Sequence, residues 1–244
     1  MAGVCLQHRK TYPLRFLVTC DIFCPTLAMD SNCEILEPQV LYFKAVPIGV
    51  ESAQRLDPRR EVYRLNLETC QGLQGLPSVV IIKKRKEDSH DGYQQEIENY
   101  ERLRRLQGSV IPTFFGQGTF NDGPAIIISE VVGTTLRDIA YGDLQISSDE
   151  LRHKLEIAME SIHCLGAEYL DQRLDNFILC KTGEIMIVDM EQVYFPPDLE
   201  VFKESVNYGG VGSLLYLFND TRERKNQSTD CVYGRTCLQG SLLY

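Results

Sequence analysis

The feature that most constrains this chain is a pair of short apolar runs separated by a glycine-containing turn. The runs are residues 177–179 and 185–188, with the turn at residues 181–183. Two such runs about a tight turn predict a β-hairpin. Because a hairpin returns the chain to where it began, we expect Asp189, at its end, to lie beside Asn176, at its start.

A third polar side chain stands close to this hairpin in the sequence. Asp171 precedes Asn176 by five residues, on the loop that leads into the hairpin. The three side chains would then converge, and Mg²⁺ prefers a few hard oxygen ligands together with phosphates. The stretch from residue 166 to residue 192 therefore predicts a magnesium site formed by Asn176 and Asp189, with the carboxylate of Asp171 beside it.

The charge of the chain argues against two classes of partner. The 244 residues carry a formal net charge of −9, whereas proteins that bind nucleic acids or anionic membranes use an excess of Lys and Arg. A basic cluster at residues 83–86 is followed at once by acidic residues. We therefore expect neither a nucleic-acid partner nor a membrane partner.

Cysteine usage and the N-terminal stretch bear on the compartment. The nine cysteines form no CxxC pair and no Cys/His cluster with zinc spacing, which favours thiols in a reducing environment. Residues 12–28 are mildly apolar, but Arg15, Asp21 and two prolines interrupt them. That stretch is too broken for a membrane span or a signal peptide. We expect a cytoplasmic protein, with the nucleus as the alternative.

The rest of the chain predicts strands first and helices later. Residues 1–40 lack a clean period, and we expect an irregular N-terminal extension there. Predicted strands, rich in β-branched and aromatic residues, lie at residues 40–47, 61–67, 79–84, 110–115 and 125–129. Between them, residues 93–106 have helical spacing and Gly108 provides a stop. Ser147 and Glu150 form a capping box for a later helix, and residues 221–227 are expected to be exposed or disordered.

This order of elements, followed by Asp171, Asn176 and Asp189, resembles the protein-kinase-like superfamily over residues 43–195. The chain is most similar to the short kinase-like proteins of fungi, which carry a run similar to Asp-x-Arg-x-x-Asn-Phe. The resemblance implies an α+β, two-lobed protein-kinase-like fold with a reduced helical C-lobe. Its parts would be an N-lobe with an antiparallel sheet and one helix at residues 41–129, a hinge at 130–133, and a truncated C-lobe with a disordered tail at 134–244.

The resemblance also implies an activity, the transfer of the γ-phosphate of ATP to a hydroxyl group with the help of Mg²⁺. Asp171 would accept the proton of the hydroxyl, and Asn176 and Asp189 would hold the metal. Glu191, two residues after Asp189, is either a further group near the metal or a surface carboxylate.

The nucleotide would be held by residues upstream of the hairpin. Lys83 ends a run similar to Val-Ala-Ile-Lys and would neutralise the phosphates, with Glu96 holding it in place. Lys84 points to the other side of the strand because the side-chain period is two. The backbone groups of Glu130 and Val132 would bind the adenine. The alternative for Lys83 is a solvated lysine at the end of a strand.

Departures from the family pattern leave other functions open. The chain has no Gly-x-Gly-x-x-Gly between its first two strands, carries Tyr169-Leu170 where protein kinases have His-Arg, and has a short segment after Asp189. These departures favour a pseudokinase that binds nucleotide or acts as a scaffold without turnover. The run Asp189-Met190-Glu191 is similar to that of aminoglycoside and choline kinases, so the acceptor is either a small molecule or a protein. A fragment of a longer gene is the third alternative.

Overall fold

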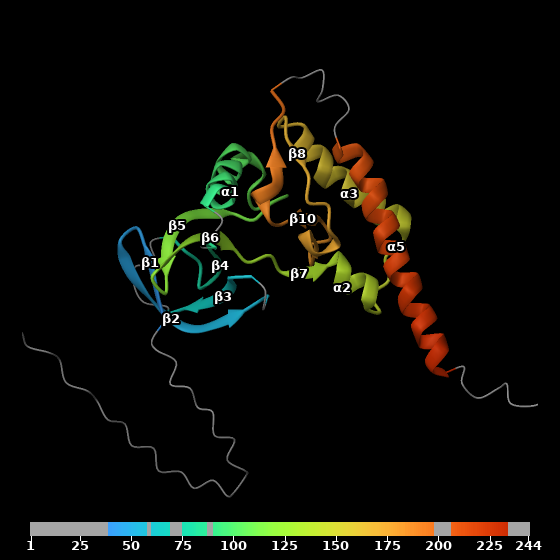
Figure 1. Ribbon diagram of the computed structural model, residues 1–244, viewed down its shortest axis with the longest axis horizontal. Coiled ribbons are helices and arrows are strands. Elements are labelled where there is room, and N and C mark those ends of the chain that lie inside the picture. Colours follow the sequence, from blue (N-terminus) through green and yellow to red (C-terminus); the bar gives the residue numbers. More distant parts are fainter. Residues whose placement is uncertain (1–38, 58–59, 69–74, 87–89, 198–205, 234–244) are drawn as a thin grey trace, which may run out of the picture. The chain divides into compact units, whose positions relative to one another are not determined.

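The computed structural model describes residues 39–57, 60–68, 75–86, 90–197 and 206–233, which belong to one compact unit (Figure 1). The irregular extension that we expected at residues 1–40 lies, apart from its last two residues, outside the described residues. Among the described helices, none combines the length and the apolar character that crossing a membrane requires.

Six antiparallel strands lie in the first half of the described chain, with one α-helix between the fourth strand and the fifth. They are β1 (Val40–Phe43), β2 (Val46–Arg55), β3 (Val62–Leu67), β4 (Val79–Lys84), β5 (Phe114–Phe120) and β6 (Gly123–Ser129). These strands close into a barrel in the order β1-β2-β3-β4-β6-β5. Strand β1 completes the barrel because it pairs with β2 on one side and with β5 on the other, where Leu41 lies opposite Phe120. Leu41, Leu65, Val80 and Ile82 belong to the apolar cluster that this barrel buries.

The closed barrel contradicts the predicted fold class. We expected a two-lobed protein-kinase-like α+β fold with an antiparallel N-lobe sheet and a reduced helical C-lobe, and that prediction is wrong. The error begins at Lys44 and Ala45, which we placed inside a single strand over residues 40–47. Both residues have positive φ angles, 49° and 62°, which is the geometry of a two-residue hairpin turn. The turn splits the segment into β1 and β2, and β1 can then pair with β5.

Strand β5 also begins later than predicted, at Phe114 instead of residue 110. Its two glycines, Gly116 and Gly118, weaken the strand pattern in the sequence. The barrel nevertheless requires Gly118, because a Cβ atom there would lie 2.5 Å from the carbonyl oxygen of Tyr42 on β1. A glycine inside a strand often marks such a close backbone approach.

Helices and short strands complete the described chain. The helices are α1 (His90–Arg102), α2 (Leu136–Tyr141), α3 (Ser148–His163) and α5 (Val206–Tyr233). The short strands are β7 (Gly133–Thr135), β8 (Glu168–Tyr169), β9 (Phe177–Cys180), β10 (Ile185–Ile187) and β11 (Val193–Tyr194). The predicted hairpin is confirmed, since β9 pairs with β10 and Phe177 lies opposite Ile187. The predicted cap of α3 is confirmed too, because the Ser147 side chain accepts a hydrogen bond from the backbone N–H of Glu150.

The larger apolar cluster crosses the segment that we predicted to be a hinge. It contains Tyr100 of α1 and Ile128 of β6, which precede residues 130–133, together with Leu155 of α3 and Phe218 of α5, which follow them. Helix α5 packs along α3 (Figure 1). Buried side chains that precede residues 130–133 therefore pack in one cluster with buried side chains of the helices that follow them.

In the charged stretch at residues 221–227, Glu223 and Arg224 are exposed, as we expected. The stretch is nevertheless helical, so the alternative of disorder is wrong. It continues α5. The guanidinium of Arg222 donates to the carbonyl oxygens of Leu144 (2.6 Å) and Ile146 (3.2 Å), and Lys225 Nζ donates to that of Gly142 (2.9 Å). These cations bind carbonyl groups around the connection between α2 and α3, so their charge ties the helix to the rest of the protein.

Candidate functional site

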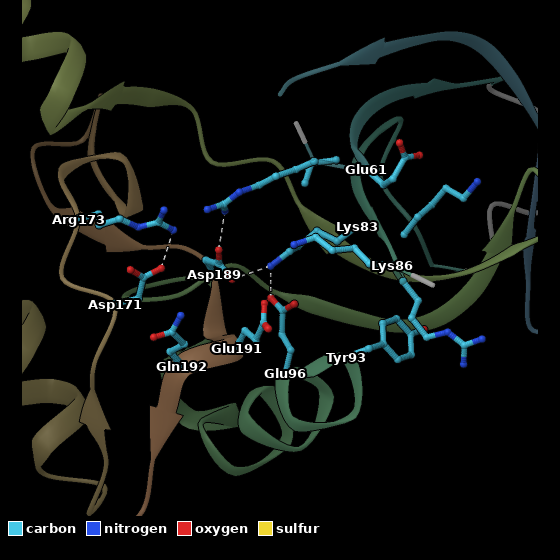
Figure 2. Close-up of a pocket in the computed structure, with 14 residues that line it drawn as sticks. Glu61, Lys83, Lys86, Tyr93, Glu96, Asp171, Arg173, Asp189, Glu191 and Gln192 are labelled. Carbon is cyan, nitrogen blue, oxygen red and sulfur yellow. Dashed lines mark hydrogen bonds and ion pairs between the residues drawn. The ribbon is translucent and has the colours of Figure 1, made fainter. Parts of the chain in front are cut away.

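A cavity of about 350 Å³ lies where the end of β4, helix α1 and the segment after β10 come together (Figure 2). Its walls carry charged side chains of both signs. Those that bear on function are Arg60, Lys83, Glu96, Asp171, Arg173, Asp189 and Glu191. The cavity therefore brings together side chains from segments that are far apart in the sequence.

Lys83 lies at the centre of this charge cluster. Its neighbour on β4, Ile82, points into the barrel, so the alternation of the strand directs Lys83 outward to α1. Lys83 Nζ donates to a carboxylate oxygen of Glu96, the partner that the helix phase predicted, and to Oδ1 of Asp189 at 3.0 Å. Burial by itself would lower the pKa of Lys83, but the charges of Glu96 and Asp189 outweigh burial and raise that pKa. Lys83 is thus held protonated between two carboxylates.

Asp189 takes an unusual backbone conformation at the end of the hairpin. Its φ and ψ angles are 68° and 81°, a left-handed geometry that costs a non-glycine residue on the order of 1 kcal/mol. Its second carboxylate oxygen, Oδ2, accepts from Arg60 Nη1 at 2.8 Å. Burial alone would raise the pKa of Asp189, but Lys83 and Arg60 reverse that effect and lower it. The strained backbone aims an ionised carboxylate into the cavity.

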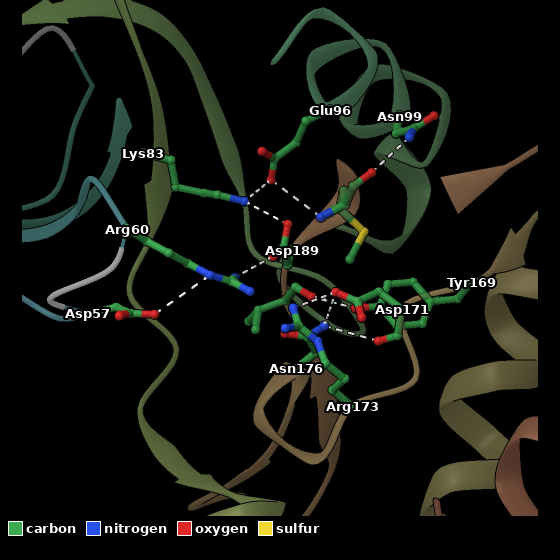
Figure 3. A network of polar contacts seen from close by, with 12 residues as sticks. Asp57, Arg60, Lys83, Glu96, Asn99, Tyr169, Asp171, Arg173, Asn176 and Asp189 are labelled. Carbon is green, nitrogen blue, oxygen red and sulfur yellow. Dashed lines mark hydrogen bonds and ion pairs between the residues drawn. The ribbon is translucent and has the colours of Figure 1, made fainter. Parts of the chain in front are cut away.

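Asp171 lies on the side of Asp189 that is away from Lys83, and two side chains hold its carboxylate (Figure 3). Its Oδ2 atom accepts from Arg173 Nη2 at 2.6 Å and from Asn176 Nδ2 at 2.8 Å. The backbone N–H of Val188 donates to the carbonyl oxygen of Asn176 at 2.8 Å. That bond returns the hairpin to its start, as we expected, and sets Asp189 next to the residues that position Asp171.

Not every predicted site residue lies in the cavity wall. Lys83, Glu96, Asp171 and Asp189 line it, whereas Asn176, only 3% exposed, does not. Neither of the two predicted adenine contacts lines it. The carboxylate of Glu130 pairs with Arg64 (2.6 Å), and Val132 is 51% exposed, with its carbonyl oxygen accepting from the N–H of Lys181 at 3.3 Å.

Sequence reasoning missed three polar residues of this region. Arg60 lies between β2 and β3, and no pattern in the sequence indicates that its side chain reaches Asp189. Arg173 stands inside the Asp-x-Arg run but was given no role. Asn99 follows Glu96 by three residues and so shares its face of α1, which could have predicted that it is buried. The structure places it at 0% exposure.

The donor set fits a magnesium ion that arrives with phosphates. Among the described residues, no group of three or more His, Cys, Asp or Glu side chains could hold a metal by itself. Asp189 offers a carboxylate, and Asn176 turns its amino group to Asp171, so its carbonyl oxygen is the atom suited to a hard cation. Mg²⁺ is commonly bound by one or two protein oxygens plus substrate phosphates. A carboxylate from Asp189 and an amide oxygen from Asn176 are thus of the chemical type that Mg²⁺ accepts alongside phosphates.

No protein-family profile matches this sequence, and no curated protein matches it.

Proposed function

We propose that this protein is a phosphotransferase that binds ATP with Mg²⁺ and moves the γ-phosphate to a hydroxyl group. The observation that carries the proposal is the position of Lys83 between Glu96 and Asp189, on the wall of a cavity that Asp171 also lines. Phosphoryl transfer depends mainly on positioning and on neutralising charge. A cation that is only 17% exposed and two ionisable acids around one cavity supply both.

Each group has a distinct role in the proposed reaction. Lys83 binds phosphate oxygens, and Glu96 keeps its ammonium group in place. Asp171 accepts the proton of the attacking hydroxyl, and we assign that task to Oδ1 because Arg173 and Asn176 both donate to Oδ2. Asp189 and Asn176 are the proposed magnesium ligands. The metal, when bound, offsets the negative charge of the transferring phosphate.

The remaining assignments follow from the same proposal. The backbone carbonyl of Glu130 and the backbone N–H of Val132 would bind the adenine, a role that rests on their place after β6. The acceptor is a hydroxyl on a small molecule or on a protein. We place the activity in the cytoplasm or nucleus, which agrees with Cys164 and Cys180 being free thiols among the described cysteines.

A second function, nucleotide binding without turnover, is favoured by two contacts of Asp189. Both carboxylate oxygens of Asp189 are engaged by cations, Oδ1 by Lys83 and Oδ2 by Arg60. A protein that kept these ion pairs with nucleotide bound could not offer Asp189 to a metal. It would then be a binding or scaffold module of the pseudokinase type.

Two measurements on the full chain separate these functions. Thermal stabilisation by ATP should be larger with Mg²⁺ than with EDTA, and Asp189→Ala should abolish that difference; no stabilisation of the folded wild type by any nucleotide would rule out both functions. Release of phosphate from ATP, with water as the acceptor, should fall at least about a hundredfold in Asp171→Asn while ATP binding persists. If the wild-type protein binds ATP and releases no phosphate, the binding module is the correct function.

A further inference from the structure

We propose that Arg60 is a phosphate-binding residue of the cavity, which pairs with Asp189 in the free protein and moves to the terminal phosphates when a nucleotide enters. This inference rests on the proposed function and adds a role for a residue to which the resemblance assigns none. Arg60 would contribute a cation where the sequence has no glycine-rich loop to supply backbone N–H groups.

The first support is the path of the Arg60 side chain. It leaves the connection between β2 and β3 and crosses to Asp189, where Nη1 donates to Oδ2 at 2.8 Å (Figure 3). Its backbone is anchored at the barrel end of that connection, since Arg60 N–H donates to the carbonyl oxygen of Asp57 at 3.2 Å and Leu56 N–H to that of Val62 at 2.9 Å. From this backbone, a long cationic side chain that is 34% exposed reaches the cavity.

The second support is a comparison with Arg55, which lies at the end of β2. Arg55 pairs with Glu61, only six residues away on the same hairpin, and is 43% exposed. It does not line the cavity, whereas Arg60 does. The two arginines have the same charge and come from neighbouring positions, but Arg60 spans 129 residues of sequence to reach its partner. A contact of that kind places the guanidinium inside the proposed nucleotide site.

The third support is the charge balance around Asp189. Lys83 already shares its positive charge between Glu96 and Asp189. A triphosphate chain carries more negative charge than one Mg²⁺ neutralises, so a further cation is needed near its end. The guanidinium has five N–H donors in a planar fork that matches phosphate oxygens. When Arg60 moves from Oδ2 to a phosphate, the same oxygen of Asp189 becomes available to the metal.

The test compares nucleotide binding by the full chain and its variants, without any measurement of turnover. Dissociation constants for ATP, ADP and AMP are measured by calorimetry, first with EDTA and then with Mg²⁺. In EDTA, Arg60→Gln should weaken ATP binding about tenfold, the effect of one lost charge-assisted contact, and should change AMP binding less than about twofold. Arg60→Lys keeps the charge but lacks the planar fork of N–H donors, so its affinity for ATP should lie between those of the wild type and Arg60→Gln. Arg55→Gln is the matched control and should bind all three nucleotides as the wild type does.

Each other result overturns the inference in its own way. Equal ATP binding by Arg60→Gln and wild type means that Arg60 takes no part in binding. Tighter ATP binding by Arg60→Gln means that the arginine only blocks Asp189. Equal weakening of ATP and AMP means that the substitution distorts the whole site, which the Arg60→Lys variant and the melting temperatures would also reveal. If folded wild-type protein binds no nucleotide, the proposed function itself fails, and the role of Arg60 with it.

Discussion

The side-chain amide of Asn99 donates to the backbone carbonyl oxygens of Met190, at 2.7 Å, and of Val193, at 3.1 Å. Asn99 is fully buried on α1, and Met190 directly follows Asp189. The N–H of Met190 also donates to Glu96 at 3.3 Å. Helix α1 is therefore fastened to the segment that positions Asp189, and the Lys83–Glu96–Asp189 cluster is assembled without any ligand.

Replacing Asn99 with leucine should destabilise the protein by about 2–3 kcal/mol, because two buried carbonyl groups lose their donor. Urea denaturation measures the loss. Gln94→Leu, an exposed change on the same helix, should alter stability by less than about 0.5 kcal/mol. Equal stability of the two variants would show that the Asn99 hydrogen bonds contribute nothing.

Removing the charge of Lys83 should lower the stability of the folded protein more than removing the charge of Lys84, its neighbour on β4. Lys83→Met leaves Glu96 and Asp189 without their shared cation and should lower the unfolding free energy by about 3 kcal/mol. Adding Glu96→Gln should restore part of that loss, because it removes one of the unpaired charges. Lys84→Met is the control and should cost less than about 0.5 kcal/mol. A double variant less stable than Lys83→Met would contradict this account of the pair.

The lowered pKa of Asp189 predicts how the stability of the folded protein changes with pH. Burial opposes the lowering, and Lys83 and Arg60 produce it. A carboxyl whose pKa is lower in the folded state stabilises the protein above its unfolded pKa, about 4, and this contribution is lost as the pH falls through the folded value. The stability difference between wild type and Asp189→Asn should therefore be constant above about pH 5 and should shrink below about pH 4.

Urea denaturation of both proteins between pH 3 and pH 7 measures that difference. Asp122→Asn, in the exposed turn between β5 and β6, is the control for a carboxylate outside the cluster. The prediction fails if the gap for Asp189→Asn stays the same down to pH 3.

Gly133→Ala should loosen the three-stranded sheet after the barrel. A Cβ atom at Gly133 would lie 2.4 Å from the carbonyl oxygen of Leu179 on β9, so β7 would have to move. We expect a loss of about 1–3 kcal/mol in thermal or urea unfolding. Gly212→Ala on α5 meets no atom within 4 Å and should instead stabilise the protein by about 0.5–1 kcal/mol. Equal effects of the two changes would disprove the steric explanation.

Strand and helix periods were enough to predict the parts of the fold with a clear local pattern. Strand β4 has its predicted bounds, and the apolar stripe and cap of α3 located that helix. Barrel closure could not be predicted, because it depends on a turn at Lys44 and Ala45 that lacks the usual Gly or Asn. The bounds of β5 could not be predicted either, because Gly118 weakens its strand pattern. That glycine allows the close approach of β1, a strand that is distant in the sequence.

The candidate site also contains some residues that could be predicted from local patterns and others that could not. Lys83 and Glu96 could be placed from strand alternation and helix phase, and Asp189 from the return of the hairpin. Arg60 could not, because its contact with Asp189 depends on how the connection between β2 and β3 lies over the end of β10, and neither segment encodes that arrangement locally. The burial of Asn99 depends likewise on the packing of α1 against the segment after Asp189.

Barrel closure also sets an order of events during synthesis. The chain emerges from its N-terminus, so β1 has β2 as a partner early but must wait for β5, which begins at Phe114. Contacts between residues as far apart as Leu41 and Phe120 form slowly. In the interval, β1 offers an unpaired backbone edge to other nascent chains. Rapid translation through residues 44–113 would shorten that interval, and a pause there would lengthen it, so the yield of folded protein should depend on translation speed in this stretch.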